Sequence, residues 1–202
     1  MLPDYNSLWT RDNDYLNHLW TVRDEYEADI AVPMRTEAPD YCGAAPLLNQ
    51  RPNASTLGYF VVSQNCIAVH AFTHELGHVL GADHDPSNLD EDNEAMYPYA
   101  HGKVHVGLSE DEAFRTIMAY RCPQRQNGCP RIPVFSHRTL TWNGTPVGDA
   151  YTYDNARVIT NTAKFVSHYR TGELADVAES GDQFGRSLAA GDFNGDGLED
   201  LA

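Results

Sequence analysis

Three histidines and one glutamate between positions 74 and 84 have a spacing that can bring their side chains to one point. On an α-helix, His74 and His78 are one turn apart and project from the same face, so both imidazoles can reach one metal ion about 2.0 Å away. Gly81 can take a positive φ, end the helix and turn the chain, which lets His84 approach the same ion. Three protein ligands leave the fourth position of a tetrahedral zinc ion open for water, as in catalytic sites. Glu75, next to a ligand, can then take a proton from that water.

The run from His74 to His84 reads H-E-x-x-H-x-x-G-x-x-H, and the chain therefore resembles the metzincin zinc peptidases, which have this signature. The alternative is a helix whose histidines only pack in the core or lie at the surface, which is a common situation for a single histidine. Metzincins place a methionine-containing turn beneath the zinc, and the segment around Met118 resembles that turn. Without the histidines, a methionine in such an apolar run would be read as a core residue.

Four further segments resemble the reprolysin-like, adamalysin-related branch of the metzincins. They are residues 41–44, 84–85, 129–136 and 154–159, and the matched segments together span most of residues 14–170. The resemblance implies that Gly43, Ala44 and Ala45 lie at the strand edge that pairs with an extended substrate. It also implies that Asp85 is a buried carboxylate that anchors the helix without binding zinc, the alternative being a solvent-facing acid.

Tyr120 departs from the snake-venom members of this branch. It is similar to the tyrosine of astacins and serralysins that can reach the metal and then swing to stabilise the tetrahedral oxyanion. The alternative is a buried tyrosine whose hydroxyl group binds the backbone. We interpret His101 and His105 as loop or surface residues, because three histidines already supply the protein ligands of a catalytic zinc.

Hydrophobic periodicity predicts the elements that position these residues. It indicates an amphipathic helix over 12–28, buried strands over 29–34 and 58–63, an irregular segment over 85–105, and a closing helix over 153–170 capped by Asp154 or Asn155. The predicted fold class is α/β, as in a metzincin-type protease with a mixed twisted sheet, an active-site helix, a Met-turn and a C-terminal helix. We assign residues 1–172 to this catalytic domain, which lacks the N-terminal strands usual in metzincins, so we expect a fragment of a longer product.

The C-terminal segment has a different character. Residues 173–181 are a polar linker, and residues 182–202 resemble one partial FG-GAP repeat of a calcium-binding β-propeller. Four oxygen ligands for Ca²⁺ are predicted there: Asp192, Asn194, Asp196 and Asp200. A bidentate Glu of an EF-hand would fall beyond the last residue, and one repeat cannot form a blade, so we expect the natural protein to continue. The alternative is a solvated acidic tail.

Composition limits the function classes. A hydrophobic content of 42% is typical of globular proteins, and a net charge of −15 argues against nucleic-acid partners. No window of about 18 apolar residues predicts a transmembrane helix, and no signal peptide opens the chain, so an export segment would lie upstream or have been removed. We expect Cys42 to pair with Cys66 and Cys122 with Cys129, although four cysteines allow other pairings, and hence an oxidising compartment.

These observations predict a secreted zinc endopeptidase that acts on a protein or peptide substrate. In this reading, His74, His78 and His84 hold zinc, and Glu75 takes the proton of the attacking water and passes it to the leaving nitrogen. Tyr120 helps to bind the oxyanion. The alternative is a calcium-dependent adhesion or surface protein in which the metzincin-like domain is inactive.

Overall fold

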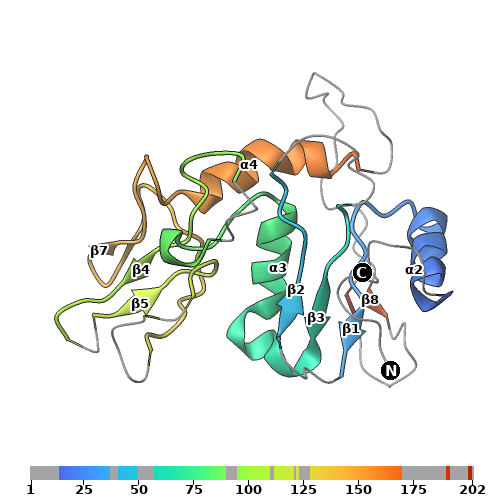
Figure 1. Cartoon of the computed structure of the whole chain (residues 1–202), viewed down its shortest axis with the longest axis horizontal. Coiled ribbons are helices and arrows are strands. Elements are labelled where there is room, and N and C mark those ends of the chain that lie inside the picture. The colour runs from blue at the N-terminus through green and yellow to red at the C-terminus, as the bar shows by residue number, and fades with distance from the viewer. Residues whose placement is uncertain are drawn as a thin grey trace.

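A short mixed sheet lies beside the helix that carries the histidine pair (Figure 1). The computed structural model describes residues 14–36, 41–49, 57–89, 95–109, 112–120, 122 and 128–169, and the backbone of 190–191 and 200–201. The sheet has the strand order β1-β3-β2, and the strands are Met34–Arg35 (β1), Gly43–Ala44 (β2) and Val61–Ser63 (β3). β1 runs parallel to β3 and β2 runs antiparallel to it, so β2 is an edge strand. The sheet and the helices together confirm the predicted mixed α/β class.

The helices agree with the predicted periodicity, with shorter ends. They are α2 (Asp14–Glu25), α3 (Ala71–Val79) and α4 (Asn155–Val166). The N-cap of α4 is Asp154, whose side chain accepts a hydrogen bond from the backbone of Arg157, which satisfies one free N–H of the first turn. α4 crosses the C-terminal end of α3 (Figure 1), where the Thr162 hydroxyl donates to the Leu80 carbonyl at 2.6 Å.

The strand predicted over 29–34 is interrupted in the structure. Ala31 forms an isolated parallel bridge with Tyr59, and regular pairing resumes only at Met34. Pro33 lies between these two points and has no N–H to donate to a neighbouring strand, so it breaks the ladder at this place. The second predicted strand, over 58–63, is present in its last three residues as β3.

Two hairpins form on the other side of α3 from α2 (Figure 1), and the sequence pattern did not predict them. Their strands are Val104–His105 (β4), Phe114–Arg115 (β5), Thr141–Trp142 (β6) and Thr145–Pro146 (β7). Asn143 and Gly144 connect β6 to β7 with φ values of 48° and 81°. Asn-Gly is the dipeptide that two-residue hairpin turns with positive φ prefer, so this turn could have been predicted. Short 3₁₀ segments cover Gln64–Val69 and Pro86–Asn88.

The largest buried cluster joins the sheet to α3 and α4. Its members are Leu48, Phe60, Val79, Leu80, Val166 and Tyr169. Burying each large apolar side chain contributes about 1.5–3 kcal/mol, so this cluster fixes α3 in place against the sheet and α4. α2 joins the sheet through Leu19, which packs against Val61, and through a buried arginine. The Arg23 guanidinium lies 4.7 Å from the Tyr59 ring centroid and donates to the Asp29 carbonyl at 2.8 Å.

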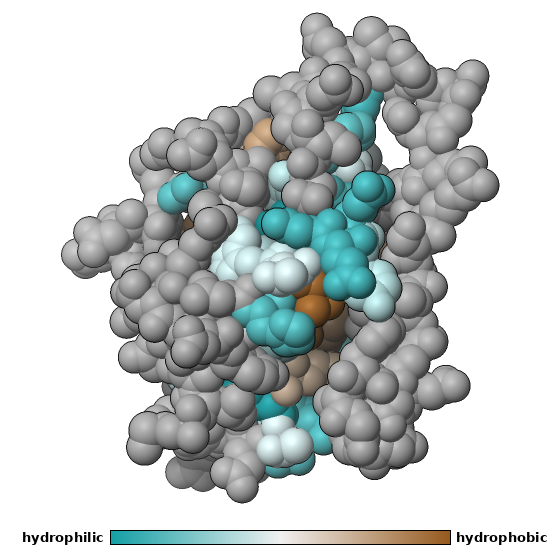
Figure 2. Space-filling model, turned by 90° about the vertical axis from the view of Figure 1, so that its right-hand side faces the viewer, coloured by the Kyte–Doolittle hydropathy of each residue, from teal (hydrophilic) through white to brown (hydrophobic). Residues whose placement is uncertain are grey.

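The end of the molecule that carries α2 presents mainly hydrophilic side chains among its described residues, with a small hydrophobic area between them (Figure 2). Within α2, Leu19 packs against Val61 whereas Asp24 and Glu25 are exposed, so this helix has one inward and one outward face, as predicted. Of the helices described, none has the length and apolar character needed to cross a bilayer.

Both predicted disulfides are present. Cys42 is bonded to Cys66, which ties β2 to the segment that leads into α3, and Cys122 is bonded to Cys129. The C-terminal segment contributes one antiparallel pair, Ala190–Gly191 (β8) with Asp200–Leu201 (β9). The predicted linker over 173–181 lies outside the described residues.

Candidate metal centre

α3 presents two histidines on one face, as the spacing predicts. His74 and His78 are 6% and 7% exposed, and their ring centroids are 4.9 Å apart. The next turn of chain reverses at Gly81, whose φ is +83°. A Cβ at this position would lie 3.2 Å from the Leu48 carbonyl oxygen, so both the backbone conformation and the space favour glycine.

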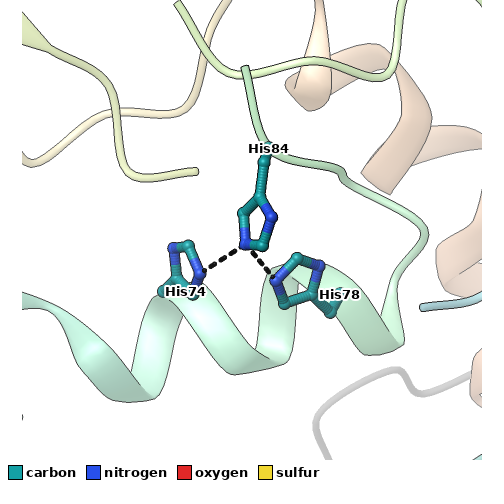
Figure 3. Close-up of side chains that lie close together, drawn as sticks. All are labelled: His74, His78 and His84. Carbon is teal, nitrogen blue, oxygen red and sulfur yellow. Dashed lines mark hydrogen bonds between the residues drawn. The ribbon is translucent and has the colours of Figure 1, made fainter. Parts of the chain in front are cut away.

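The reversal brings the third histidine to the first two (Figure 3). His84 Nε2 is 3.2 Å from His74 Nε2 and 3.0 Å from His78 Nε2. Within the described part of the chain, these three residues are the one group of at least three His, Cys, Asp or Glu side chains that could share an ion.

Backbone contacts decide which ring nitrogens carry the protons. His74 Nδ1 donates to the Ile117 carbonyl at 2.9 Å, and His78 Nδ1 donates to the Ala82 carbonyl at 3.0 Å. A carbonyl oxygen can only accept, so in a neutral ring each Nε2 has a lone pair that faces His84. A single proton on His84 Nε2 can satisfy only one of these two lone pairs, whereas a cation among the three nitrogens satisfies all of them. Three imidazole nitrogens are a donor set that fits zinc.

Burial keeps the three rings neutral. Loss of solvent lowers the pKa of His74 to about 3 and the pKa of His84 to about 4, and it lowers the pKa of His78 well below its usual value. Imidazole binds metals in its neutral form, so the rings need to release no proton at neutral pH before they bind an ion.

Glu75 is buried between α3 and the edge strand β2. Its side chain is in contact with Gly43, since a Cβ built there would lie 2.6 Å from Glu75 Cγ and 2.8 Å from Glu75 Oε1. Burial raises the pKa of Glu75 from 4.5 to about 8, and the positive charge of Arg131 opposes this shift. The sequence reading placed Gly43 at the substrate edge, and the structure adds that its missing side chain makes room for the glutamate. Ala44 belongs to the same strand, whereas Ala45 follows it.

Met118 lies directly against the histidine helix. It is fully buried, and a Cβ on Gly77 would lie 2.5 Å from its sulfur atom. The chain turns just here, because the Ala119 N–H binds the Thr116 carbonyl at 3.0 Å.

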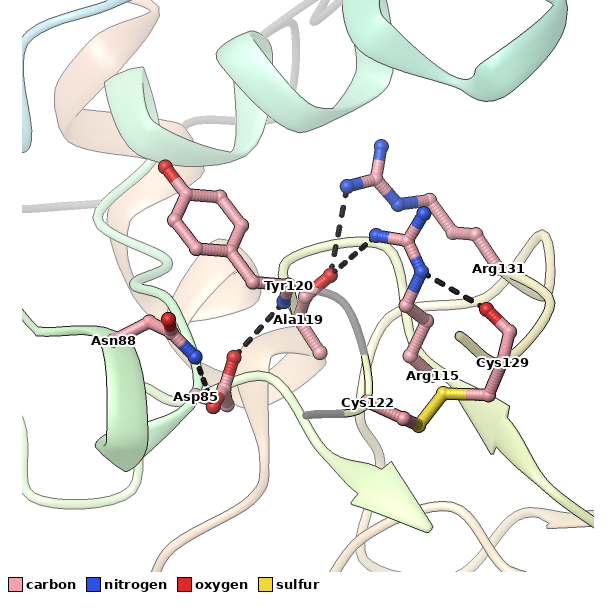
Figure 4. Close-up of a disulfide and its surroundings, with 8 residues drawn as sticks. All are labelled: Asp85, Asn88, Arg115, Ala119, Tyr120, Cys122, Cys129 and Arg131. Atoms are coloured by element: carbon pink, nitrogen blue, oxygen red, sulfur yellow. Dashed lines mark hydrogen bonds between the residues drawn. A yellow bond between two sulfur atoms is a disulfide. The ribbon is translucent and has the colours of Figure 1, made fainter. Parts of the chain in front are cut away.

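Asp85 is 4% exposed, which rules out the solvent-facing alternative. Its Oδ1 accepts from the Tyr120 backbone N–H, and its Oδ2 accepts from the Asn88 side chain, both at 2.9 Å (Figure 4). The sequence reading expected Asp85 to anchor the helix. Its contacts join the segment after the third histidine to the segment after Met118.

Tyr120 is 42% exposed, and its ring centroid lies 4.1 Å from that of His84. The ring therefore borders the histidine cluster and is not a buried core tyrosine. Burial of its hydroxyl, followed by the charge of Glu75, raises the pKa of Tyr120, so the phenol remains a proton donor at neutral pH.

His101 holds the backbone of the third histidine, a role that the sequence reading missed. Its Nδ1 donates to the His84 carbonyl at 3.0 Å, and the His84 N–H donates to Asp83 Oδ1 at 2.7 Å. His105 belongs to β4. No sequence signal distinguished His101, because its partner is a backbone atom and not a motif residue.

The predicted calcium ligands cannot be placed. Asp192, Asn194 and Asp196 lie outside the described residues, and for Asp200 only the β9 backbone is described. Calcium binding therefore stays a prediction.

Comparisons with known proteins identify both segments of the chain. A reprolysin-type model of metallopeptidase family M12 matches residues 1–136, and the FG-GAP repeat model matches residues 184–202. The chain is 33% identical over 159 residues to a peptidyl-Asp metalloendopeptidase of Xanthomonas campestris pv. campestris. It is 32% identical over 156 residues to a protein of the same name from Stenotrophomonas maltophilia strain K279a.

These matches cover 79% and 77% of this chain, which spans 35% of the length of either relative. A solved chain described as "Structure of a chaperone-substrate complex" shares the fold with a TM-score of 0.51 at 21% identity. That match covers 79% of this chain and 23% of the solved one. The M12 model and the relatives extend over the histidine cluster, Glu75 and Met118, so the chain belongs to metallopeptidase family M12.

Proposed function

We propose that this chain is the catalytic part of a secreted zinc endopeptidase in which His74, His78 and His84 hold the metal. The observation that carries the proposal is the convergence of three Nε2 atoms, with neighbouring distances of 3.0 and 3.2 Å, while two of the rings are fixed by backbone carbonyls at Nδ1. When bound, zinc would supply Lewis-acid chemistry, lowering the pKa of a water molecule toward about 7 and polarising the substrate carbonyl.

Glu75 is the proposed general base and acid. It takes a proton from the water as the water attacks the peptide carbonyl carbon, and it then gives that proton to the leaving nitrogen. Its pKa of about 8 favours this role, because a carboxyl group with a raised pKa can both accept and release a proton near neutral pH. Met118 packs against Gly77 and thereby supports the helix under the site, which is the role proposed for the Met-turn.

β2 and Tyr120 are proposed to handle the substrate. β2 is an edge strand, and an extended peptide can add to the outer side of such a strand, which supports the proposed pairing with Gly43, Ala44 and Ala45. The Tyr120 hydroxyl is proposed to donate to the oxyanion, since its ring lies on the His84 ring.

The relatives named peptidyl-Asp metalloendopeptidase lead us to propose a peptide bond next to aspartate as the site of cleavage. Secretion is proposed from the two disulfides, because such bonds persist in oxidising compartments.

The test is cleavage of casein by the zinc-loaded chain, with and without a chelator. Cleavage should require zinc, and Glu75→Gln should retain zinc but lose activity by at least about 100-fold. Glu25→Gln, at an exposed position of α2, serves as the matched control and should cleave as the parent does. A Glu75→Gln protein with undiminished activity would contradict the assignment of the base.

The FG-GAP match favours a second candidate, a calcium-dependent adhesion protein whose metzincin-like domain is inactive. In that case Asp192, Asn194, Asp196 and Asp200 would bind calcium, and the zinc-loaded protein would show no chelator-sensitive cleavage.

A further inference from the structure

Arg131 lies close to Tyr120 in space although it is distant from it in sequence, and its guanidinium group points with that of Arg115 toward the Ala119 carbonyl (Figure 4). Its Nη1 donates to the Val69 carbonyl at 3.0 Å, and its Nη2 donates to the Ala119 carbonyl at 3.5 Å. Val69 ends the 3₁₀ segment that leads into α3, and Ala119 directly precedes Tyr120. The guanidinium therefore borders the metal centre from the side of the Met118 turn.

The positive charge of Arg131 is not neutralised within the described part of the chain. Its hydrogen-bond partners are carbonyl groups, none of the ion pairs among the described residues includes it, and its Nε is buried with no partner. A second cation, Arg115, donates to the same Ala119 carbonyl at 2.9 Å. Burial, followed by the charge of Arg115, lowers the pKa of Arg131 to about 10. Two adjacent guanidinium groups in a partly buried place favour an incoming anion.

The same surroundings place that anion next to the reacting groups. Arg131 binds the carbonyl of Ala119, the residue before Tyr120, and its positive charge acts on Glu75, so an anion bound there would be near the proposed oxyanion donor and the proposed base. A peptide held at this site would reach Arg131 with a side chain close to the cleaved bond. A guanidinium has five N–H donors in a flat fork that matches a carboxylate, and the two carbonyls leave several of them free.

We propose that Arg131 is the specificity-determining residue that binds the side-chain carboxylate of the substrate residue adjacent to the cleaved bond. This inference rests on the proposed peptidase function and adds which residue of the chain recognises the aspartate. Arg115 and the Cys122–Cys129 disulfide hold it in position. Arg115 Nε donates to the Cys129 carbonyl at 3.2 Å. Arg131 follows that cysteine by two residues, and its backbone forms an isolated parallel β-bridge with the backbone of Arg115.

The first test uses the zinc-loaded chain and two pairs of peptides whose quenched fluorescence appears on cleavage. The two peptides of a pair differ only in having Asp or Asn beside the cleaved bond. This residue lies before the bond in one pair and after it in the other. In one of the two pairs, the parent should prefer Asp by about 100-fold in kcat/KM, because the neutral amide leaves the guanidinium without its counter-ion. Arg131→Gln should reduce that ratio to about threefold or less, and Arg131→Lys should retain part of it. The control is Arg138→Gln, which removes a half-exposed arginine paired with Asp154 on another part of the surface and should keep the ratio.

An equal loss on the Asp and Asn peptides in Arg131→Gln would overturn the proposal, because it would mean that Arg131 acts on the base or on folding. Charge reversal gives a second readout: Arg131→Glu should prefer Lys over Asp beside the cleaved bond, and a retained Asp preference would count against the proposal.

A binding measurement separates this inference from the proposed activity. In the zinc-loaded Glu75→Gln protein, calorimetry should show tighter binding of the Asp peptide than of the Asn peptide, and adding Arg131→Gln should remove the difference. This result would support the recognition role even if no peptide were cleaved. Equal affinity for the two peptides, or no binding of either, would refute it.

Discussion

Gly43→Ala should disable the proposed base while leaving the fold and the metal site in place. The added methyl group would lie 2.6 Å from Glu75 Cγ, 2.8 Å from Oε1 and 2.9 Å from Cδ, which are distances that real Cβ atoms do not adopt. The clashing atoms form the outer part of one side chain, so we expect the carboxyl group to move and the strand to stay.

The two effects of this change differ in size. Turning one side chain off its preferred rotamer costs of the order of 0.5–1.5 kcal/mol, so the free energy of unfolding should fall by about that amount. A displaced general base should lower kcat by about 10²–10⁴-fold, which corresponds to about 3–5.5 kcal/mol of activation free energy. Catalysis should thus suffer several times more than stability.

The assay combines peptide-cleavage kinetics, zinc content and urea unfolding of the purified protein. Thr141→Ala is the control, because it also changes one small side chain in a short strand, at an exposed position of β6 that has no proposed role in the site. It should leave kcat within about threefold of the parent, since general-base loss accounts for far larger effects. Full activity of Gly43→Ala would refute the reasoning, because the working carboxyl group would then not occupy the position beneath β2.

Three further predictions concern stability. Gly77→Ala would place a Cβ 2.5 Å from the Met118 sulfur and 3.1 Å from Phe135 Cε1, so this overpacking should destabilise the protein by about 1–3 kcal/mol in urea unfolding, and an unchanged midpoint would argue against the contact. In the metal-free protein, the pKa of Glu75 is raised from 4.5 to about 8, so the unfolded chain loses this proton at a lower pH than the folded protein does, and the free energy of unfolding should fall as pH rises from about 4.5 to 8. Glu75→Gln should lack this part of the pH dependence when melting is measured with a chelator present. The same pH dependence in the parent and in the variant would contradict the burial argument. Zinc at 100 times its Kd should add about 2.7 kcal/mol of stability, and His84→Ala should remove most of that gain in a calorimetric melt, whereas an equal gain in the variant would exclude His84 as a ligand.

Local periodicity explains why the convergence of the three histidines could be predicted from sequence. His74 and His78 are related by one turn of a single helix, and Gly81 has the positive φ that its residue type favours. Asp154 could be named as one of two caps for the same reason. These features depend on a few neighbouring residues, whose conformation is set by short-range sterics and hydrogen bonds.

Contacts between distant segments explain what the sequence did not reveal. Arg131 reaches Val69 across 62 positions, and Gly43 meets Glu75 only because β2 packs beside α3. Asp85 was expected to be a buried carboxylate, with a solvent-facing acid as the alternative, but its partner, the Tyr120 N–H, follows from the packing of two loops. The break at Pro33 and the Asn143-Gly144 turn had local signals, and both could have been predicted from residue type alone.

The hydrogen bond from the Tyr120 N–H to Asp85 determines how that tyrosine can move. A backbone fixed at this point makes rotation about the two side-chain bonds the available route by which the phenol approaches or leaves the histidine cluster. Rotamer changes of exposed side chains take picoseconds to nanoseconds, whereas loop opening takes nanoseconds to microseconds. The movement of Tyr120 proposed above would then need only side-chain rotation and no loop opening, because Asp85 holds the backbone at this point.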